Sequence, residues 1–144
     1  MSIAQGRKNQ NIAEILLVED NQHDVMLTLK AFKALEIPHT ITVAKNGEHA
    51  LEILNQEGIY TLSVLPDLIL LDLGLPKMAG IDILKKIKST KSLKDIPVVV
   101  LTGSLDEKNI IESYDLKASS YIVKPIDLNR QHIIEDLLSI HGFK

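Results

Sequence analysis

Short apolar runs alternate along the chain with amphipathic segments. Residues 15–18, 41–44, 68–71, 98–101 and 121–123 are rich in leucine and β-branched side chains, which predicts five strands. Between them, apolar residues recur at helical spacing, as Ile83, Leu84 and Ile87 do, which predicts helices. Strands without polar alternation are typical of a parallel sheet covered by helices on both faces.

This alternation, repeated five times, predicts one doubly wound α/β domain. A last helix is expected after residue 124, where Ile133, Ile134, Leu137 and Leu138 form an apolar stripe that suits core burial better than an interface. We expect residues 1–12 to be a flexible tail and residues 13–144 to form the domain. Segment 58–65 is longer than a minimal connection and has no assigned role.

Composition narrows the class of protein. A formal charge of −3 argues against nucleic acid as the main partner, so we expect no direct DNA binding. The absence of cysteine excludes disulfides and thiolate metal sites. No apolar run approaches the roughly 18 residues of a membrane span, and the first residues, MSIAQGRKNQN, lack a signal-peptide pattern. These features predict a cytoplasmic protein that does not enter membranes.

Residues 66–76 read PDLILLDLGLP, so an apolar run ends abruptly on the carboxylate of Asp72. An unpaired, ionised carboxylate is costly in a dry interior, which places Asp72 at the mouth of the core. The first strand ends on two more carboxylates, Glu19 and Asp20. In open α/β sheets, ligands bind outside the carboxyl ends of the strands. Three carboxylates converging there would repel one another without a cation, and an all-oxygen donor set favours Mg²⁺.

The two remaining strand ends add a hydroxyl and an ammonium group. Thr102 ends the fourth strand and Lys124 follows the fifth. A hydroxyl and an ammonium opposite a Mg²⁺ site are suited to the oxygens of a phosphoryl group in transfer. The pattern therefore predicts that Asp72 is a nucleophile that accepts a phosphoryl group.

The order Glu19-Asp20, Asp72, Thr102 and Lys124-Pro125 on five β-α units resembles the receiver domain of two-component response regulators, over residues 14–141. The resemblance implies a flavodoxin-like (βα)5 fold with a parallel sheet in the order 2-1-3-4-5. The segments VEDNQHD and LKDIPVVVLT also look like those of small stand-alone receivers that partner phytochrome-type histidine kinases in cyanobacteria.

The resemblance also implies a set of metal ligands. Asp72 would be the phosphoacceptor, and Asp72 and Asp20 would bind Mg²⁺ directly. Glu19 would act through a metal-bound water, and the backbone carbonyl of Gly74 would supply a further ligand.

The other implied roles concern the phosphorylated state. Thr102 and Lys124 would each bind a phosphoryl oxygen, and a cis peptide bond to Pro125 would position Lys124. Tyr121 matches an aromatic residue that swings inward on activation in the family. An aromatic residue on an edge strand is as readily a core filler, and both interpretations stay open.

The function implied is a phosphorylation switch. A sensor histidine kinase would transfer a phosphoryl group to Asp72, and altered protein contacts, including homodimerisation, would carry the signal through residues 106–116, 119–123 and 128–141. Two alternatives are a receiver that docks or dimerises without phosphorylation, and a phosphohydrolase with an aspartyl nucleophile. Similar phosphatases carry a second aspartate where this chain has Gly74, so hydrolysis should be slow and the protein is not expected to be an enzyme.

One departure from the family pattern concerns a helix end. Ala79 stands where receivers commonly have an acidic residue before the glycine. The helix that begins near Gly80 is therefore expected to lack its usual N-cap.

Overall fold

The computed structural model describes residues 12–75, 79–103, 115–124, 126 and 131–143. Its sheet contains five parallel strands: β1 (Ala13–Val18), β2 (His39–Ala44), β3 (Leu68–Asp72), β4 (Val98–Thr102) and β5 (Ser120–Val123). They lie in the order β2-β1-β3-β4-β5. The predicted strands and their order are confirmed. β1, β2 and β5 begin one or two residues before their apolar runs, and β3 and β4 end one residue after theirs.

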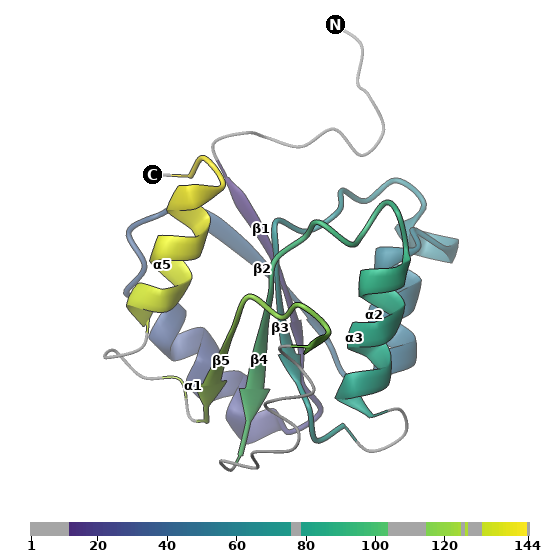
Figure 1. Ribbon diagram of the computed structural model, residues 1–144. Coiled ribbons are helices and arrows are strands. Elements are labelled where there is room, and N and C mark those ends of the chain that lie inside the picture. Colours follow the sequence, from purple (N-terminus) through teal and green to yellow (C-terminus); the bar gives the residue numbers. More distant parts are fainter. Residues whose placement is uncertain (1–11, 76–78, 104–114, 125, 127–130, 144) are drawn as a thin grey trace, which may run out of the picture.

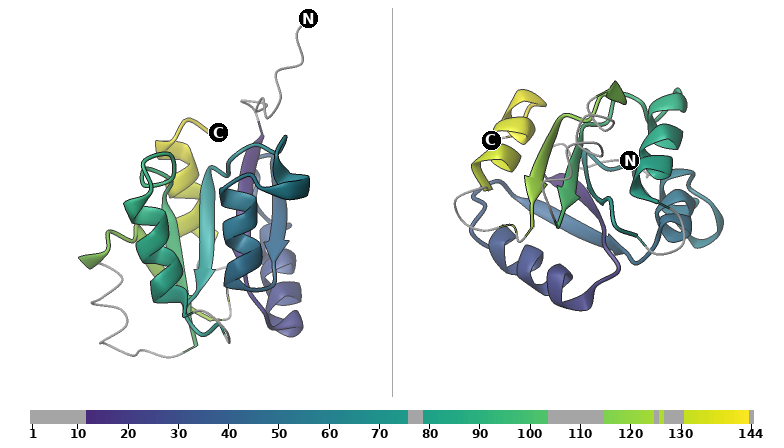
Figure 2. Two further views of the ribbon diagram at one scale, coloured as in Figure 1. Left: turned by 90° about the vertical axis from the view of Figure 1, so that its right-hand side faces the viewer. Right: turned by 60° about the horizontal axis from the view of Figure 1, so that its bottom comes forward.

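Helices cover both faces of this sheet, as expected. The described helices are α1 (Gln22–Phe32), α2 (Gly47–Leu54), α3 (Gly80–Ser89), α5 (Gln131–Ile140) and the 3₁₀ helix η1 (Gly58–Tyr60). Helices α1 and α5 pack on one face, and α2 and α3 pack on the other (Figures 1 and 2). The strands point toward the bottom of Figure 1, so their carboxyl ends share one edge of the sheet.

Successive residues of the central strands enter two separate cores. In β3, Leu68 and Leu70 join the cluster under α1 and α5, whereas Ile69 and Leu71 join the cluster under α2 and α3. All four side chains are fully buried. Because neighbouring residues of a strand point to opposite faces, an uninterrupted apolar run is what a sheet buried on both sides requires.

The helix starts follow local side-chain chemistry. The side chain of Asn21 accepts a hydrogen bond from the backbone N–H of Asp24, and Asn46 does the same for His49, so α1 and α2 have N-caps. Helix α3 begins after Ala79 without a side-chain cap, which confirms the expectation from the sequence.

Segment 58–65 forms a folded connection between α2 and β3. The chain turns through positive φ angles at Gln56 and at Gly58, which is the first residue of η1. Nε2 of His49 lies 2.6 Å from the hydroxyl of Tyr60, and the Gln56 amide donates to the carbonyl of Ser63. The segment is therefore tied to α2 through Tyr60, although Ile59 and Leu62 within it are largely exposed.

Helix α5 buries its apolar stripe against the sheet. Ile134 and Leu138 are fully buried, and Ile133 and Leu137 pack partly against the same core. Only the last apolar residue, Ile140, is largely exposed among the described residues of this helix. Core burial is therefore confirmed for most of the stripe. The expected tail falls almost entirely outside the described residues, and no described helix is long and apolar enough to cross a membrane.

The uncapped start of α3 predicts a stabilising substitution. An asparagine at position 79 can accept a hydrogen bond from the first turn of α3, so Ala79→Asn should raise the free energy of unfolding by about 1 kcal/mol. Asn46→Ala removes an existing cap of the same kind and should lower it by about 1 kcal/mol. Urea unfolding measures both. A loss of stability in Ala79→Asn would mean that this helix end is satisfied in another way.

Candidate functional site

The strand register brings the predicted site residues to one edge of the sheet. Val18 pairs with Leu71, so the residues that follow them, Glu19 and Asp72, lie side by side. Thr102 pairs with Val123, and the backbone N–H of Lys124 then donates to the carbonyl of Thr102 at 2.7 Å. An open pocket of about 410 Å³ at this edge is lined by Glu19, Asp20, Asn21, Asp24, Asp72, Leu73, Gly74, Thr102, Gly103 and Lys124.

Asp72 is held at the base of this pocket. The residue is 4% exposed, whereas the four preceding residues of β3 are completely buried. Its Oδ1 accepts a hydrogen bond from the backbone N–H of Gly74 at 2.9 Å, and its Oδ2 lies 3.3 Å from Nζ of Lys124. These contacts offset part of the cost of a buried carboxylate and leave it facing the pocket.

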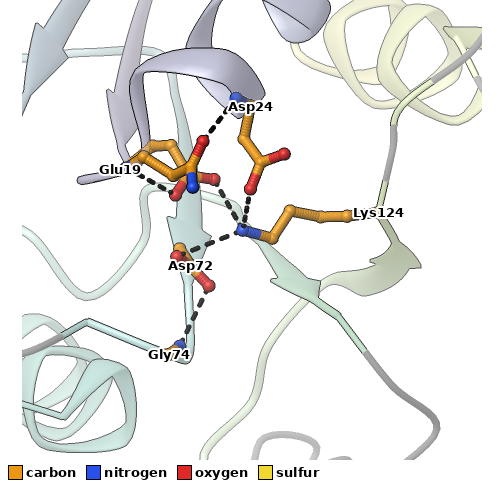
Figure 3. A network of polar contacts seen from close by, with 6 residues as sticks. Glu19, Asp24, Asp72, Gly74 and Lys124 are labelled. Carbon is orange, nitrogen blue, oxygen red and sulfur yellow. Dashed lines mark hydrogen bonds and ion pairs between the residues drawn. The ribbon is translucent and has the colours of Figure 1, made fainter.

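The ammonium group of Lys124 joins three carboxylates. Its Nζ lies 2.8 Å from Oε1 of Glu19 and 3.0 Å from Oδ2 of Asp24, in addition to the contact with Asp72 (Figure 3). The three carboxylates come from the end of β1, the first turn of α1 and the end of β3. One charge from β5 therefore links elements that are far apart in the sequence.

Burial and charge shift the pKa values of this pair. Burial raises the pKa of Glu19 from 4.5 to about 7, and a hydrogen bond and the charge of Asp72 act in the same direction, against the effect of Lys124. Burial alone would lower the pKa of the Lys124 ammonium. Its hydrogen bonds to Glu19 and Asp24 and the charges of Asp72 and Glu19 outweigh that effect and raise the pKa, so the ammonium stays charged.

Glu19, Asp20 and Asp72 form a donor set that fits a divalent metal ion. One carboxylate oxygen from each lies within 4.8 Å of the other two. Glu19 and Asp72 are buried, whereas Asp20 is exposed on the rim. Oxygen ligands in this number, facing an open pocket, suit a hard cation that keeps part of its water shell.

The other predicted residues fall into three groups. Thr102 is buried at the end of β4 and lines the pocket, as does Gly74. The backbone N–H of Gly74 contacts Asp72, and a metal-binding role for its carbonyl stays a prediction. Tyr121 is half-buried and packs against the cluster under α2 and α3, so both interpretations of its role stay open. Pro125 lies outside the described residues, as does its predicted cis bond.

The structure adds Asp24, which sequence reasoning missed. Asp24 is the third residue of α1, and its carboxylate reaches back over the strand end to Lys124. An acidic residue in a first helical turn is usually explained by the helix dipole alone. A usable signal was its position in the first turn of the helix that directly follows the acidic strand end.

Gly80 is a second addition, and it acts through the backbone. A Cβ atom at this position would lie 2.4 Å from the carbonyl oxygen of Asp72 and 2.6 Å from Cα of Leu73. The start of α3 therefore contacts the end of β3 so closely that only glycine fits. This contact fixes the backbone that carries Asp72.

Comparison with known proteins identifies the family. Residues 15–136 match the model of the response regulator receiver domain, and the chain belongs to that family. The chain is 44% identical to the response regulator Rcp1 of Synechocystis sp. over 114 residues, which cover 79% of this chain and 78% of that protein. It is 40% identical to a probable methanogenesis regulatory protein, FilR2, of Methanothrix harundinacea over 119 residues, or 81% and 76% of the two chains.

Solved structures of response regulators share the fold, and two of those described below are named as phytochrome response regulators. The bacteriophytochrome response regulator AtBRR superposes with a TM-score of 0.79 at 37% identity, covering 90% of this chain and 94% of that one. The Mn²⁺-bound form of Rcp1 superposes with a TM-score of 0.75 at 40% identity, covering 91% of this chain and 93% of that one. Phosphorylated RcpA, a cyanobacterial phytochrome response regulator, gives 0.75 at 42% identity and 90% and 91% coverage. The flavodoxin-like receiver fold is thereby confirmed.

The close contact at Gly80 predicts a large effect of a single methyl group. Gly80→Ala must displace the backbone at Asp72 or the start of α3, so we expect a loss of about 2 kcal/mol or more in the free energy of unfolding. Gly103→Ala is the matched control, because a Cβ there would have no neighbour within 4 Å. Equal stabilities of the two variants in urea unfolding would contradict the contact.

The raised pKa of Glu19 predicts how stability depends on pH when divalent cations are removed. The unfolded chain releases this proton near pH 4.5 and the folded protein near 7, so the folded state binds more protons between these values. Stability contributed by Glu19 therefore falls as the pH rises through this window. In EDTA, the free energy of unfolding of wild type should fall by up to about 3 kcal/mol relative to that of Glu19→Gln as the pH rises from 4.5 to about 7. Parallel pH profiles of the two proteins would show that the pKa is not raised.

Proposed function

We propose that this receiver is a phosphorylation switch. A sensor histidine kinase donates a phosphoryl group from its phosphohistidine to Asp72 in a Mg²⁺-dependent reaction. The modified protein then signals through altered contacts with other proteins.

One observation carries this proposal: the nearly buried Asp72 lies between a charged ammonium group and a divalent-metal donor set. Nζ of Lys124 lies 3.3 Å from its Oδ2, and Glu19 and Asp20 offer oxygens within 4.8 Å. A metal site without Lys124 would suit simple ion storage, and a lysine without the carboxylates would leave a phosphoryl group poorly neutralised. Their combination is what phosphoryl transfer requires.

Mg²⁺ is the proposed ion, which Asp20 and Asp72 would hold directly and Glu19 through a bound water, with the Gly74 carbonyl as a further ligand. The Mn²⁺-bound form of Rcp1 supports a divalent ion in a relative that is 40% identical. When bound, the ion supplies positive charge next to the phosphoryl oxygens and orients them.

The chemistry assigned to the chain is a displacement at phosphorus. A carboxylate oxygen of Asp72 attacks, a P–O bond forms, and the P–N bond of the phosphohistidine breaks. The imidazole takes the bonding electron pair and leaves neutral when its other nitrogen carries a proton. Lys124 binds one phosphoryl oxygen through its ammonium, and the Thr102 hydroxyl donates a hydrogen bond to another.

The kinase and the output are assigned by similarity and by placement. Likeness to AtBRR and to RcpA supports a phytochrome-type histidine kinase as donor, and RcpA has been observed in a phosphorylated form. The proposed output surface includes Tyr121 and α5 and lies along β5, the outermost strand on one side of the sheet. Homodimerisation through this surface is one proposed form of output. A cytoplasmic location and the absence of direct DNA binding are further parts of the proposal, based on the sequence.

The protein is proposed to be a switch and not a turnover enzyme. Gly74, two residues after Asp72, has no side chain that could activate a water molecule, and its N–H is already bound to Asp72. Hydrolysis of the acyl phosphate should therefore be slow.

Phosphoryl uptake from acetyl phosphate tests this function. Intact-mass measurement should show one added phosphoryl group in the presence of Mg²⁺, and none in EDTA or in Asp72→Asn. Asp82→Asn is the matched control, because it makes the same replacement at an exposed aspartate in the first turn of α3. This variant should be phosphorylated like wild type. Modification of Asp72→Asn, or uptake independent of Mg²⁺, would move the phosphoacceptor or the metal elsewhere. Fast release of phosphate with turnover would instead favour a phosphohydrolase.

A further inference from the structure

We infer that Asp24 is a positioning residue for phosphoryl transfer: it keeps the Lys124 ammonium in the site when a divalent cation engages the other carboxylates that hold it. The inference rests on the proposed function for its role in the reaction. Its structural part concerns which groups hold Lys124, and this part can be tested separately.

The distances define a shared ammonium group. Nζ of Lys124 has three protons, and three carboxylates lie within reach: Glu19 at 2.8 Å, Asp24 at 3.0 Å and Asp72 at 3.3 Å. The ammonium donates hydrogen bonds to Glu19 and Asp24, and it forms an ion pair with Asp72. The side chain of Lys124 is 15% exposed, and loss of these partners would leave its charge partly desolvated without compensation.

The three carboxylates differ in what else they bind. Glu19 and Asp72 belong to the metal donor set, together with Asp20, whereas Asp24 does not. A divalent cation in that set draws on the oxygens of Glu19 and Asp72 and repels the ammonium. Of the three partners that Lys124 has among the described residues, Asp24 alone keeps its full negative charge available to the ammonium in the metal-loaded state.

Local structure holds Asp24 in this position. Its backbone N–H is bound by the side chain of Asn21 at 3.0 Å, which fixes the first turn of α1 directly after the strand end. Its side chain is 27% exposed and extends from the first turn of α1 toward Lys124 (Figure 3). A carboxylate placed at the rim can hold the ammonium beside Asp72 without occupying the metal site.

The consequence is specific to the metal-loaded protein. Asp24→Asn has nearly the same shape but lacks the charge, so Lys124 should remain in place without a cation, held by Glu19 and Asp72. With Mg²⁺ bound, the ammonium should lose its position before the phosphoryl group arrives. Removing a group that contacts a transferring oxygen lowers the reaction rate about 100-fold or more. Asp24 acts only through Lys124, so its replacement should slow phosphoryl uptake by about tenfold.

The structural test observes the ammonium group of Lys124 by ¹⁵N NMR. Its signal is identified by its loss in Lys124→Met, and slow proton exchange reports that it is hydrogen-bonded. We expect wild type to retain the signal at saturating Mg²⁺, and Asp24→Asn to retain it in EDTA but lose it on adding Mg²⁺. A signal that survives Mg²⁺ in Asp24→Asn, or one that disappears from wild type with Mg²⁺, would overturn the inference.

The functional test compares rates of uptake from acetyl phosphate. Asp24→Asn should slow uptake about tenfold, Asp24→Glu should recover most of the rate, and Glu48→Gln should match wild type. Glu48 is the matched control because it is likewise an acidic residue in a first helical turn, that of α2, and it is exposed. In a Lys124→Met background, Asp24→Asn should have no further effect, because it acts through Lys124.

The outcomes separate this inference from the proposed function. A wild-type protein that takes up no phosphoryl group would contradict the proposed function, and the NMR comparison would still decide whether Asp24 holds Lys124. Normal uptake by Asp24→Asn, or a tenfold loss that persists in the Lys124→Met background, would overturn the positioning role while leaving the switch intact.

Discussion

The architecture of the site depends on one ammonium group among converging carboxylates. Without Lys124, Glu19 and Asp72 would face each other across adjacent strand ends in a poorly hydrated position, which proteins avoid. With it, the ends of β1, β3 and β5 and the start of α1 are joined by charge-assisted contacts. The remaining negative charge leaves this edge of the sheet suited to a divalent cation and an incoming phosphoryl group.

Much of the fold was predictable because burial on both faces leaves a simple pattern. Residues 68–71 and 98–101 are apolar without interruption, and polar residues appear only where those strands reach the site. The same contrast revealed Asp72, Thr102 and Lys124, since each comes directly after an apolar run that has no other reason to end on a polar group. The uncapped start of α3 was also readable, because capping depends on a residue's immediate neighbours.

The parts that sequence reasoning missed depend on proximity in three dimensions. Asp24 looks like an ordinary first-turn carboxylate until the fold brings Lys124 to it from 100 residues away. Gly80 looks like an ordinary residue at a helix start until the backbone of Asp72 is found against it. The closure of segment 58–65 depends on a contact between His49 and Tyr60 that neither residue signals alone. In each case the partner is fixed by packing and not by spacing.

The division of the interior into two cores has a mechanical consequence. Because Leu70 and Leu71 enter different cores, sliding β3 by one residue would exchange the contents of both, which the packing on either side forbids. The strand register is thus fixed, and a chemical event at the carboxyl ends of the strands cannot be relayed by a slip of register. Any change of shape has to travel through side-chain rotations and the loops that follow the strands.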